Sequence, residues 1–395
     1  MRSYRDLFRT PEFTPLFLAA SAQTLARTTS GLALATLVHR ETASPLLSAL
    51  SMFGPSLAHV LGATLFMSAA DRLPPRATMT GSALAFATAT AALALPGLPV
   101  TGIFAILLVN GLMASVGGGV GWGLLNEILP KDGYLLGRSA FNMMNGITQI
   151  TGYATGGVLI AVLSPRPSLL TAAALFLTAG LIARLGLTRR PPRAVGRPSV
   201  RATWQANARL WSSPPRRLVY LGLWLPNGLI VGCEALYVSY APDSAGTLFA
   251  CAAVGMLAGD VAVGRLIPPD RRRRLAAPLL LLLATPYVFF VLQPPLPVAA
   301  ALATVASAGF GASLVQQERL MSLTPPELSG HALGLHSSGM LTMQGTAATL
   351  AGALAELTSP PVAMTTLALT SATVTVLLTA TARHHSRRST EPAPS

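Results

Sequence analysis

The chain of 395 residues is 51% hydrophobic and only 11% charged, with a formal net charge of +14. Charged residues make up about a quarter of an average soluble domain, so this composition excludes an ordinary soluble protein. The positive charge falls in short runs between apolar stretches, which is typical of membrane-protein loops and argues against nucleic-acid binding.

Twelve apolar stretches follow one another along the chain, each about as long as the roughly 20 residues that cross a bilayer as a helix. The first six are Thr14–Val38, Leu46–Ala70, Ala77–Pro96, Val100–Ile128, Gly137–Leu163 and Leu169–Leu187. The second six are Val219–Tyr240, Ala245–Leu266, Leu275–Leu292, Val298–Ser322, Gly330–Leu357 and Pro361–Ala382. The sequence therefore predicts an all-α membrane protein with twelve transmembrane helices.

The basic residues predict the orientation, because cytoplasmic loops carry an excess of Arg and Lys. With the N-terminus inside, the inner loops hold Arg2, Arg5, Arg9, Arg72, Arg76, Lys131, Arg138, the arginines from Arg189 to Arg217, Arg271 to Arg274, Arg383, Arg387 and Arg388. The outer loops then hold only Arg40 and Arg166. We therefore expect a multi-pass protein of the cell (inner or plasma) membrane with both termini cytoplasmic.

The chain also repeats itself at half its length. Three features share an offset of 193 residues: Asp71-Arg72-Leu73 with Gly264-Arg265-Leu266, Gly118 with Gly311, and Gly137 with Gly330. Such a repeat indicates duplication of a six-helix unit. The expected parts are an N-terminal half (1–188), a central cytoplasmic loop (189–218), a C-terminal half (219–383) and a disordered tail (384–395).

Two motifs give the chain a resemblance over essentially its whole length. The loop Asp71-Arg72-Leu73-Pro74-Pro75-Arg76 is similar to the acidic-basic motif of the major facilitator superfamily, although Met67 and Pro74 replace its two glycines. The stretch from Leu129 through Arg138 and Asn142 to Gly156-Gly157 resembles one found in bacterial drug and metabolite exporters of that superfamily. The resemblance implies paired six-helix halves and secondary transport, and it leaves the cargo open.

The loop motif also has a physical role that is independent of any family. Asp71 sits at a helix end beside Arg72 and Arg76, where a carboxylate can form a latch with arginine or with a helix N-terminus. In the second half Asp260 lies one turn before Gly264-Arg265, so it could pair with Arg265 on the same helix face. The alternative is that these charges only anchor loops at the lipid headgroups.

Ionisable residues inside the membrane are functional candidates, because burying a charge there is costly. Glu234 lies in a stretch interrupted by proline and glycine, so we expect it to carry the coupled proton; a structural hydrogen bond to another helix is the alternative. His336 is the other proton-transfer candidate. Arg27, in the middle of the first span, is expected to attract an anionic substrate group or to pair with a buried carboxylate. The alternative is that it snorkels or ties its helix to a neighbour's carbonyls.

Further polar and aromatic residues could line a cavity, although interhelical packing explains them equally well. They are Gln23, Asn110, Asn142, Asn145, Gln149, Trp224 and Gln344. The histidines show no metal-ligand spacing and no ATP motif is present, so neither a metal nor a cofactor is expected. An enzyme is not expected either, because no paired carboxylates or nucleophile–base set is visible.

The sequence thus predicts a monomeric secondary transporter that exports small amphipathic drugs or metabolites by proton antiport with alternating access. Its expected partners are the lipid bilayer, a small-molecule substrate and protons, without nucleic acid. Two alternatives remain open: an uptake carrier or uniporter of the same fold, and a non-transporting membrane receptor or scaffold.

Overall fold

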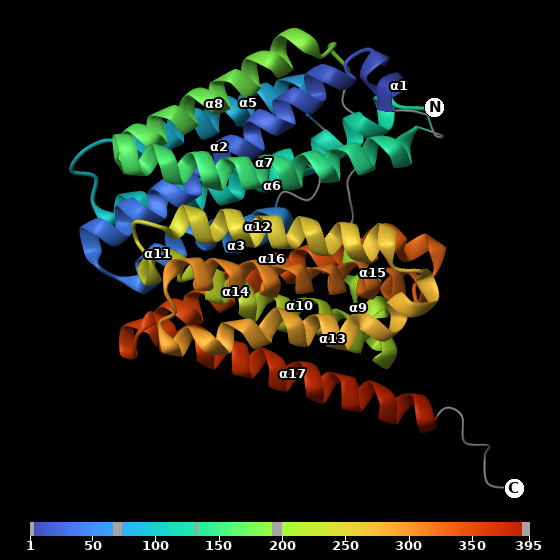
Figure 1. Cartoon of the computed structure of the whole chain (residues 1–395). Coiled ribbons are helices and arrows are strands. Elements are labelled where there is room, and N and C mark those ends of the chain that lie inside the picture. The colour runs from blue at the N-terminus through green and yellow to red at the C-terminus, as the bar shows by residue number, and fades with distance from the viewer. Residues whose placement is uncertain (1–3, 66–72, 131–132, 192–199, 389–395) are drawn as a thin grey trace, which may run out of the picture. The chain divides into compact units, whose positions relative to one another are not determined.

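The computed structural model describes residues 4–65, 73–130, 133–191 and 200–388, and within these ranges it contains helices and no strand (Figure 1). The first helices are α1 (Tyr4–Arg9), α2 (Phe13–Thr42), α3 (Pro45–Leu65), α5 (Pro75–Leu93), α6 (Val100–Ile128), α7 (Tyr134–Leu163) and α8 (Pro165–Gly186). The later ones are α9 (Val200–Ser212), α10 (Pro214–Ala235), α11 (Tyr237–Tyr240), α12 (Ala245–Val261), the π-helix η1 (Ala262–Leu266), α13 (Pro269–Val288), η2 (Phe289–Leu292), α14 (Leu296–Ala308), η3 (Gly309–Gly311), α15 (Ala312–Ser322), η4 (Pro326–Leu328), α16 (Ser329–Leu357) and α17 (Pro360–Arg388). The all-α prediction is confirmed.

In the described ranges, nine helices are long and apolar enough to cross a membrane. The predicted spans at α2, α5 and α16 are not among them, because these helices carry many hydroxyl, amide, histidine or charged side chains. A helix that is less apolar can still cross a bilayer when it packs against other helices or lines a polar cavity. The structure is therefore a multi-pass membrane fold and is consistent with twelve spans.

Prolines mark where many of these helices begin. The first helical residue, or the one before it, is a proline at Pro45, Pro75, Pro99, Pro165, Pro214, Pro269, Pro295 and Pro360. Proline suits this position because its fixed φ matches the helix and its missing N–H is not needed in the first turn. Pro55 and Pro226 lie inside α3 and α10 instead, where each removes one helical hydrogen bond.

The chain forms two compact units. Unit 1 comprises Met1–Pro198 with Tyr237–Ala253, and unit 2 comprises Ser199–Leu236 with Val254–Ser395. In unit 1, α2 packs against α7 and α8, and α3 packs against α6 (Figure 1). One end of this unit is held by an aromatic core in which Phe13 and Phe17 contact Phe141 edge-on, at ring separations of 5.9 and 5.6 Å.

The segment Tyr237–Ala253 follows α10 in the chain but packs with the helices of unit 1. The ring of Phe249 stacks on Tyr153 of α7 with the centroids 4.8 Å apart. Beside this stack, a Cβ added to Gly246 would lie 2.6 Å from the Cα of Gly157, so the two helices touch where neither has a side chain. The predicted boundaries of the two halves stay a prediction, and this segment of the predicted second half belongs to unit 1.

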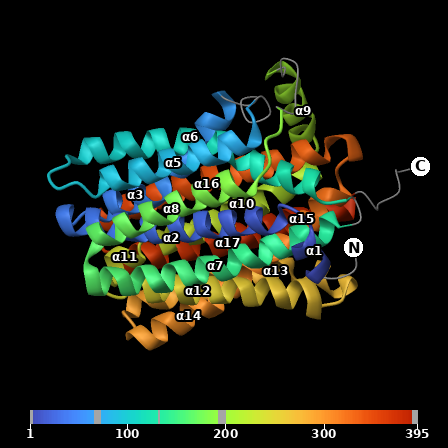
Figure 2. The ribbon, with the colours of Figure 1, turned by 90° about the horizontal axis from the view of Figure 1, so that it is seen from above.

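In unit 2, α10 is packed by α16 and α17, and α13 is packed by α17 and α14. Hydrogen bonds from side chains to backbone carbonyls tie these helices together: Ser371 Oγ donates to Pro226 O at 3.2 Å, and Cys233 Sγ donates to Met364 O at 3.3 Å. The short helix α9 projects from this bundle (Figure 2). Its buried Leu210 joins a core formed with residues of α10, α15 and α16.

Candidate functional site

Glu234 lies near the C-terminal end of α10 and is only 5% exposed. Its Oε1 accepts a hydrogen bond from Ser307 Oγ of α14 at 3.5 Å, and no other hydrogen bond or ion pair involves it in the described residues. A buried carboxyl with a single weak hydroxyl partner and no counter-charge is a group at which a membrane protein can hold a proton. The interhelical hydrogen bond that sequence reasoning weighed as the alternative also exists, so the two roles are not exclusive.

A second polar cluster lies between α10 and α15, and sequence reasoning missed it. Asn227, 1% exposed, donates from Nδ2 to Leu223 O at 2.7 Å and to Ser313 Oγ at 3.3 Å. The buried Oδ1 of Asn227 and Oε1 of Gln316 have no hydrogen-bond partner among the described atoms. Buried acceptors of this kind normally find a donor, such as water or a ligand. The signal in the sequence was an amide side chain inside each of two predicted spans.

The second proton candidate, His336, is half-buried in α16, and its Nδ1 has no hydrogen-bond partner among the described atoms. Its backbone oxygen accepts from Trp224 Nε1 at 3.0 Å. Trp224 in turn stacks on Trp211 of α9 and on Tyr220, with ring centroids 5.8 and 5.1 Å apart. Trp224 is therefore part of the aromatic stack that docks α9, in addition to its predicted place among cavity residues.

Arg27 lies 14 residues after the start of α2 and 15 before its end. Its neighbours Ala26, Thr28 and Thr29 are buried, whereas Arg27 is exposed in its unit. In the described part of the chain the side chain of Arg27 makes no hydrogen bond or ion pair. The helix α3, which packs against α2, carries His59. Gln23, one turn earlier on the same helix, is half-buried.

The remaining cavity candidates have different surroundings. Asn145 receives a hydrogen bond from Thr24 Oγ of α2 at 3.2 Å, which is the interhelical role that was the alternative to cavity lining. Gln149 and Gln344 are half-buried, and Asn142 is exposed. Asn110 has a buried Oδ1 with no hydrogen-bond partner among the described atoms.

The predicted gating loop is only partly visible, because Asp71 and Arg72 lie outside the described residues. Arg76 is half-buried in the first turn of α5. In the second half, Asp260 and Arg265 are both exposed and do not pair with each other. A different arginine acts there: Arg272 donates to the carbonyls of Gly264 and Ile267 at 2.8 and 2.7 Å, and so closes the π-helical end of η1.

A charged cluster at Glu12 was not predicted. Its carboxylate accepts from the backbone N–H and the hydroxyl of Thr188, both at 3.0 Å, and from both Nη atoms of Arg190 at 2.8 and 3.0 Å. Arg190 Nε also lies 3.7 Å from Glu127 at the end of α6. Partial burial acts to raise the pKa of Glu12, but these hydrogen bonds outweigh it and the net pKa is lowered. The signal in the sequence was an acidic residue directly after a basic N-terminus.

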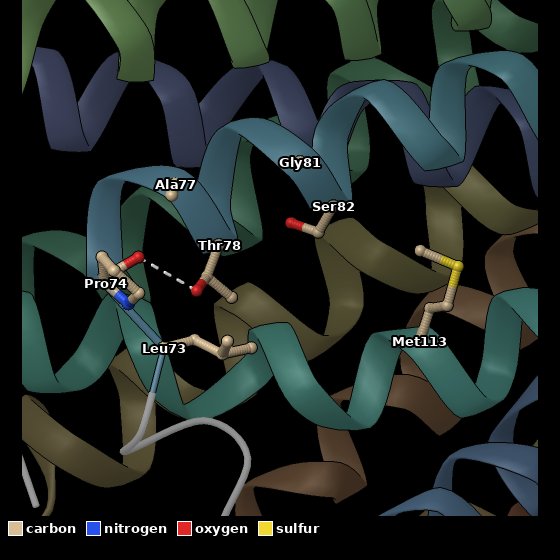
Figure 3. A pocket seen from close by; sticks show the side chains of 7 residues that line it. All are labelled: Leu73, Pro74, Ala77, Thr78, Gly81, Ser82 and Met113. Carbon is tan, nitrogen blue, oxygen red and sulfur yellow. Dashed lines mark hydrogen bonds between the residues drawn. The ribbon is translucent and has the colours of Figure 1, made fainter. Parts of the chain in front are cut away.

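A pocket of about 350 Å³ opens between α5 and α6 in unit 1 (Figure 3). Its wall is formed by Leu73, Pro74, Ala77, Thr78, Gly81, Ser82 and Met113. The hydroxyls of Thr78 and Ser82 donate to carbonyls of their own helix, at Pro74 and Met79. The pocket wall is therefore apolar and includes none of the predicted site residues.

Comparisons with known proteins agree with this architecture. The sequence profile described as the Major Facilitator Superfamily matches residues 16–242. A comparison with curated proteins found no match.

Solved transporters share the fold. A POT family transporter in complex with 5-aminolevulinic acid has a TM-score of 0.73 at 9% identity, over 93% of this chain and 96% of the other. The nucleoside transporter NupG has a TM-score of 0.70 at 12% identity, over 92% and 98% of the two chains. A bacterial homologue of the human lysosomal transporter Spinster, inward-facing and occupied, has a TM-score of 0.67 at 13% identity, over 97% and 98%. Identities this low show a common fold and do not indicate a common cargo.

Proposed function

The chain belongs to the Major Facilitator Superfamily, and from this premise we propose that it is a secondary active transporter that exports small amphipathic drugs or metabolites by proton antiport. The observation that carries the proposal is the burial of Glu234, which is 5% exposed on a membrane-spanning helix. Its carboxyl accepts a hydrogen bond from the hydroxyl of Ser307. A proton antiporter needs a group that binds the proton in one conformational state and releases it in the other. A buried carboxyl on a proline-interrupted helix suits that role. His336 is the second candidate for the same step.

Alternating access requires contacts that form in one state and break in another. Candidates at one end of unit 1 are the Gly157–Gly246 contact and the exposed ion pair between Arg40 and Asp243 at 3.8 Å. Asp71, Arg72, Arg76, Asp260 and Arg265 are proposed to contribute to gating at the cytoplasmic end. The substrate would meet Arg27, Gln23, Asn110, Asn142, Asn145, Gln149, Trp224 and Gln344.

The surroundings of the transporter are part of the proposal. The distribution of arginine favours both termini on the cytoplasmic side of the cell membrane. The working unit is proposed to be a monomer in the lipid bilayer, with a small-molecule substrate and protons as its other partners and without nucleic acid.

The test is internal pH in proteoliposomes that hold the purified protein, while amphipathic cations, anions and neutral compounds are added one at a time. We expect substrate-dependent proton flux that disappears in Glu234→Gln and persists in Glu327→Gln, a matched change at an exposed carboxyl. Substrate exchange without proton flux would favour a uniporter instead. Binding without any turnover would favour a receptor or scaffold.

A further inference from the structure

The position of Arg27 limits what its side chain can face. At about 1.5 Å per helical residue, Arg27 lies about 21 Å from either end of α2. The hydrocarbon core of a bilayer is about 30 Å thick, so the middle of such a helix lies about 15 Å from the headgroups. That distance is also more than an arginine side chain can reach. A charge exposed to lipid at this depth would be costly. A charge at this depth therefore needs water, a polar group or an anion beside it instead of lipid.

In the described part of unit 1, no long helix carries an acidic residue near its middle that could neutralise Arg27 inside the membrane, and Glu127 of α6 lies at that helix's end. The sequence of α2 contains no Asp or Glu before Glu41 in its last turn, and α3, α5, α7 and α8 contain none. Glu41 is taken by Arg166 at 2.7 Å. The Arg27 guanidinium therefore has five N–H donors and a full charge without a partner in the described part of unit 1.

A second basic side chain, His59, lies on α3, which packs against α2. Next to it, a Cβ added to Gly111 of α6 would lie 2.6 Å from Pro55 O and 3.2 Å from His59 N, so α6 and α3 touch at this level. Asn110, adjacent to Gly111, has a buried amide oxygen that lacks a hydrogen-bond partner among the described atoms. An amide can present its NH₂ to an anion as readily as its oxygen to a donor.

We propose that the transported compound carries an anionic group, a carboxylate or another planar oxyanion, which binds the guanidinium of Arg27 with His59 as the second contact. A guanidinium pairs with a carboxylate through two parallel hydrogen bonds, and such charge-assisted hydrogen bonds are stronger than those between neutral groups. The proposal rests on the proposed transport function and narrows its cargo from amphipathic molecules in general to amphipathic anions.

The test measures binding without a gradient, so that it is separate from proton coupling. Protein in lipid nanodiscs is dialysed against three probes of one shape: 1-naphthylacetate, 1-naphthylacetamide and 1-naphthylmethylammonium, with empty nanodiscs as the blank. The carboxylate should bind at least tenfold more tightly than the amide or the ammonium. Arg27→Gln should remove that tenfold preference, Arg27→Lys should keep part of it, and His59→Gln should reduce it less than Arg27→Gln does.

Arg184→Gln is the matched control, since it removes the same charge from an exposed position on α8. It should leave the preference unchanged. Equal binding of the three probes, no binding of the carboxylate, or an unchanged preference in Arg27→Gln would overturn the proposal. Carboxylate binding that depends on Arg27, in a protein that moves no protons, would support it while counting against antiport. Proton-coupled transport of the ammonium probe, unaffected by Arg27→Gln, would support antiport and overturn the proposed anion site.

Discussion

Arg190 donates two hydrogen bonds to the carboxylate of Glu12, at 2.8 and 3.0 Å, across 178 residues of chain. The pair joins the residue that precedes α2 to the segment that follows α8. Glu12 has a left-handed backbone with φ of 68°, which is uncommon for a residue other than glycine. The four hydrogen bonds to its side chain offset the cost of that conformation.

Removing the carboxylate should therefore weaken unit 1. We expect Glu12→Ala to lower the free energy of unfolding by about 1–3 kcal/mol, because charge-assisted hydrogen bonds to a partly buried carboxylate are lost together. The free energy of unfolding is measured by adding SDS to the protein in a mild detergent. Glu327→Ala, which removes an exposed carboxylate, is the control. An equal loss in both variants would contradict a special role for Glu12.

The lowered pKa of Glu12 predicts a pH dependence of stability. Because the carboxyl has a lower pKa in the folded than in the unfolded protein, its contribution is complete above the unfolded value of about 4.3. This stabilisation is lost as the pH falls through the lower pKa that Glu12 has in the folded protein. Between pH 5 and pH 3 the melting temperature of the native protein should fall further than that of Glu12→Gln. Parallel curves for the two proteins would rule this out.

The aromatic stack predicts how α9 is held. Trp211 stacks on Trp224 with ring planes 8° apart, whereas Trp204 on the same helix is 68% exposed. Stacked pairs contribute about 0.5–1.5 kcal/mol beyond the area they bury. We expect Trp211→Ala to release α9 and to speed trypsin cleavage after Arg209 several-fold. The control Trp204→Ala should be cleaved at the native rate, and equal rates in the two variants would contradict the prediction.

The contact between Gly157 and Gly246 predicts a steric effect. A side chain at Gly246 would meet the Cα of Gly157 at 2.6 Å and the carbonyl of Tyr153 at 3.0 Å. We expect Gly246→Val to separate α12 from α7 and to expose Ser239, which lies 3.4 Å from His39.

Reaction of a Ser239→Cys reporter with a membrane-impermeant maleimide measures this, in a background with Cys251→Ala. The rate should rise at least fivefold with Gly246→Val. It should stay unchanged with Gly334→Val, where a Cβ meets nothing within 4 Å. No difference between the two valines would show that the close approach is not needed to keep this end of unit 1 packed.

The positions of the helices could be read from the sequence, and some of the bounds agree to the residue. The predicted span Val100–Ile128 is α6, and Ala245–Leu266 is α12 continued by η1. These bounds are local properties, because an apolar run ends at a proline or a charged loop whatever it packs against. The pairing of Asp260 with Arg265 could not be judged in this way: the π-helical turn between them changes their relative rotation, and Arg272 takes the carbonyls at that end.

The sequence by itself thus determined a multi-pass helical membrane protein, its family resemblance and the ionisable residues inside its spans, since each follows from composition and spacing along one helix. Only the tertiary structure decided that Glu234 meets Ser307, that Glu12 meets Arg190, and that the Arg27 side chain has no partner in the described part of its unit. A polar side chain pairs across whichever helix faces come together, and residues far apart in sequence supply those faces. Local patterns do not contain that information.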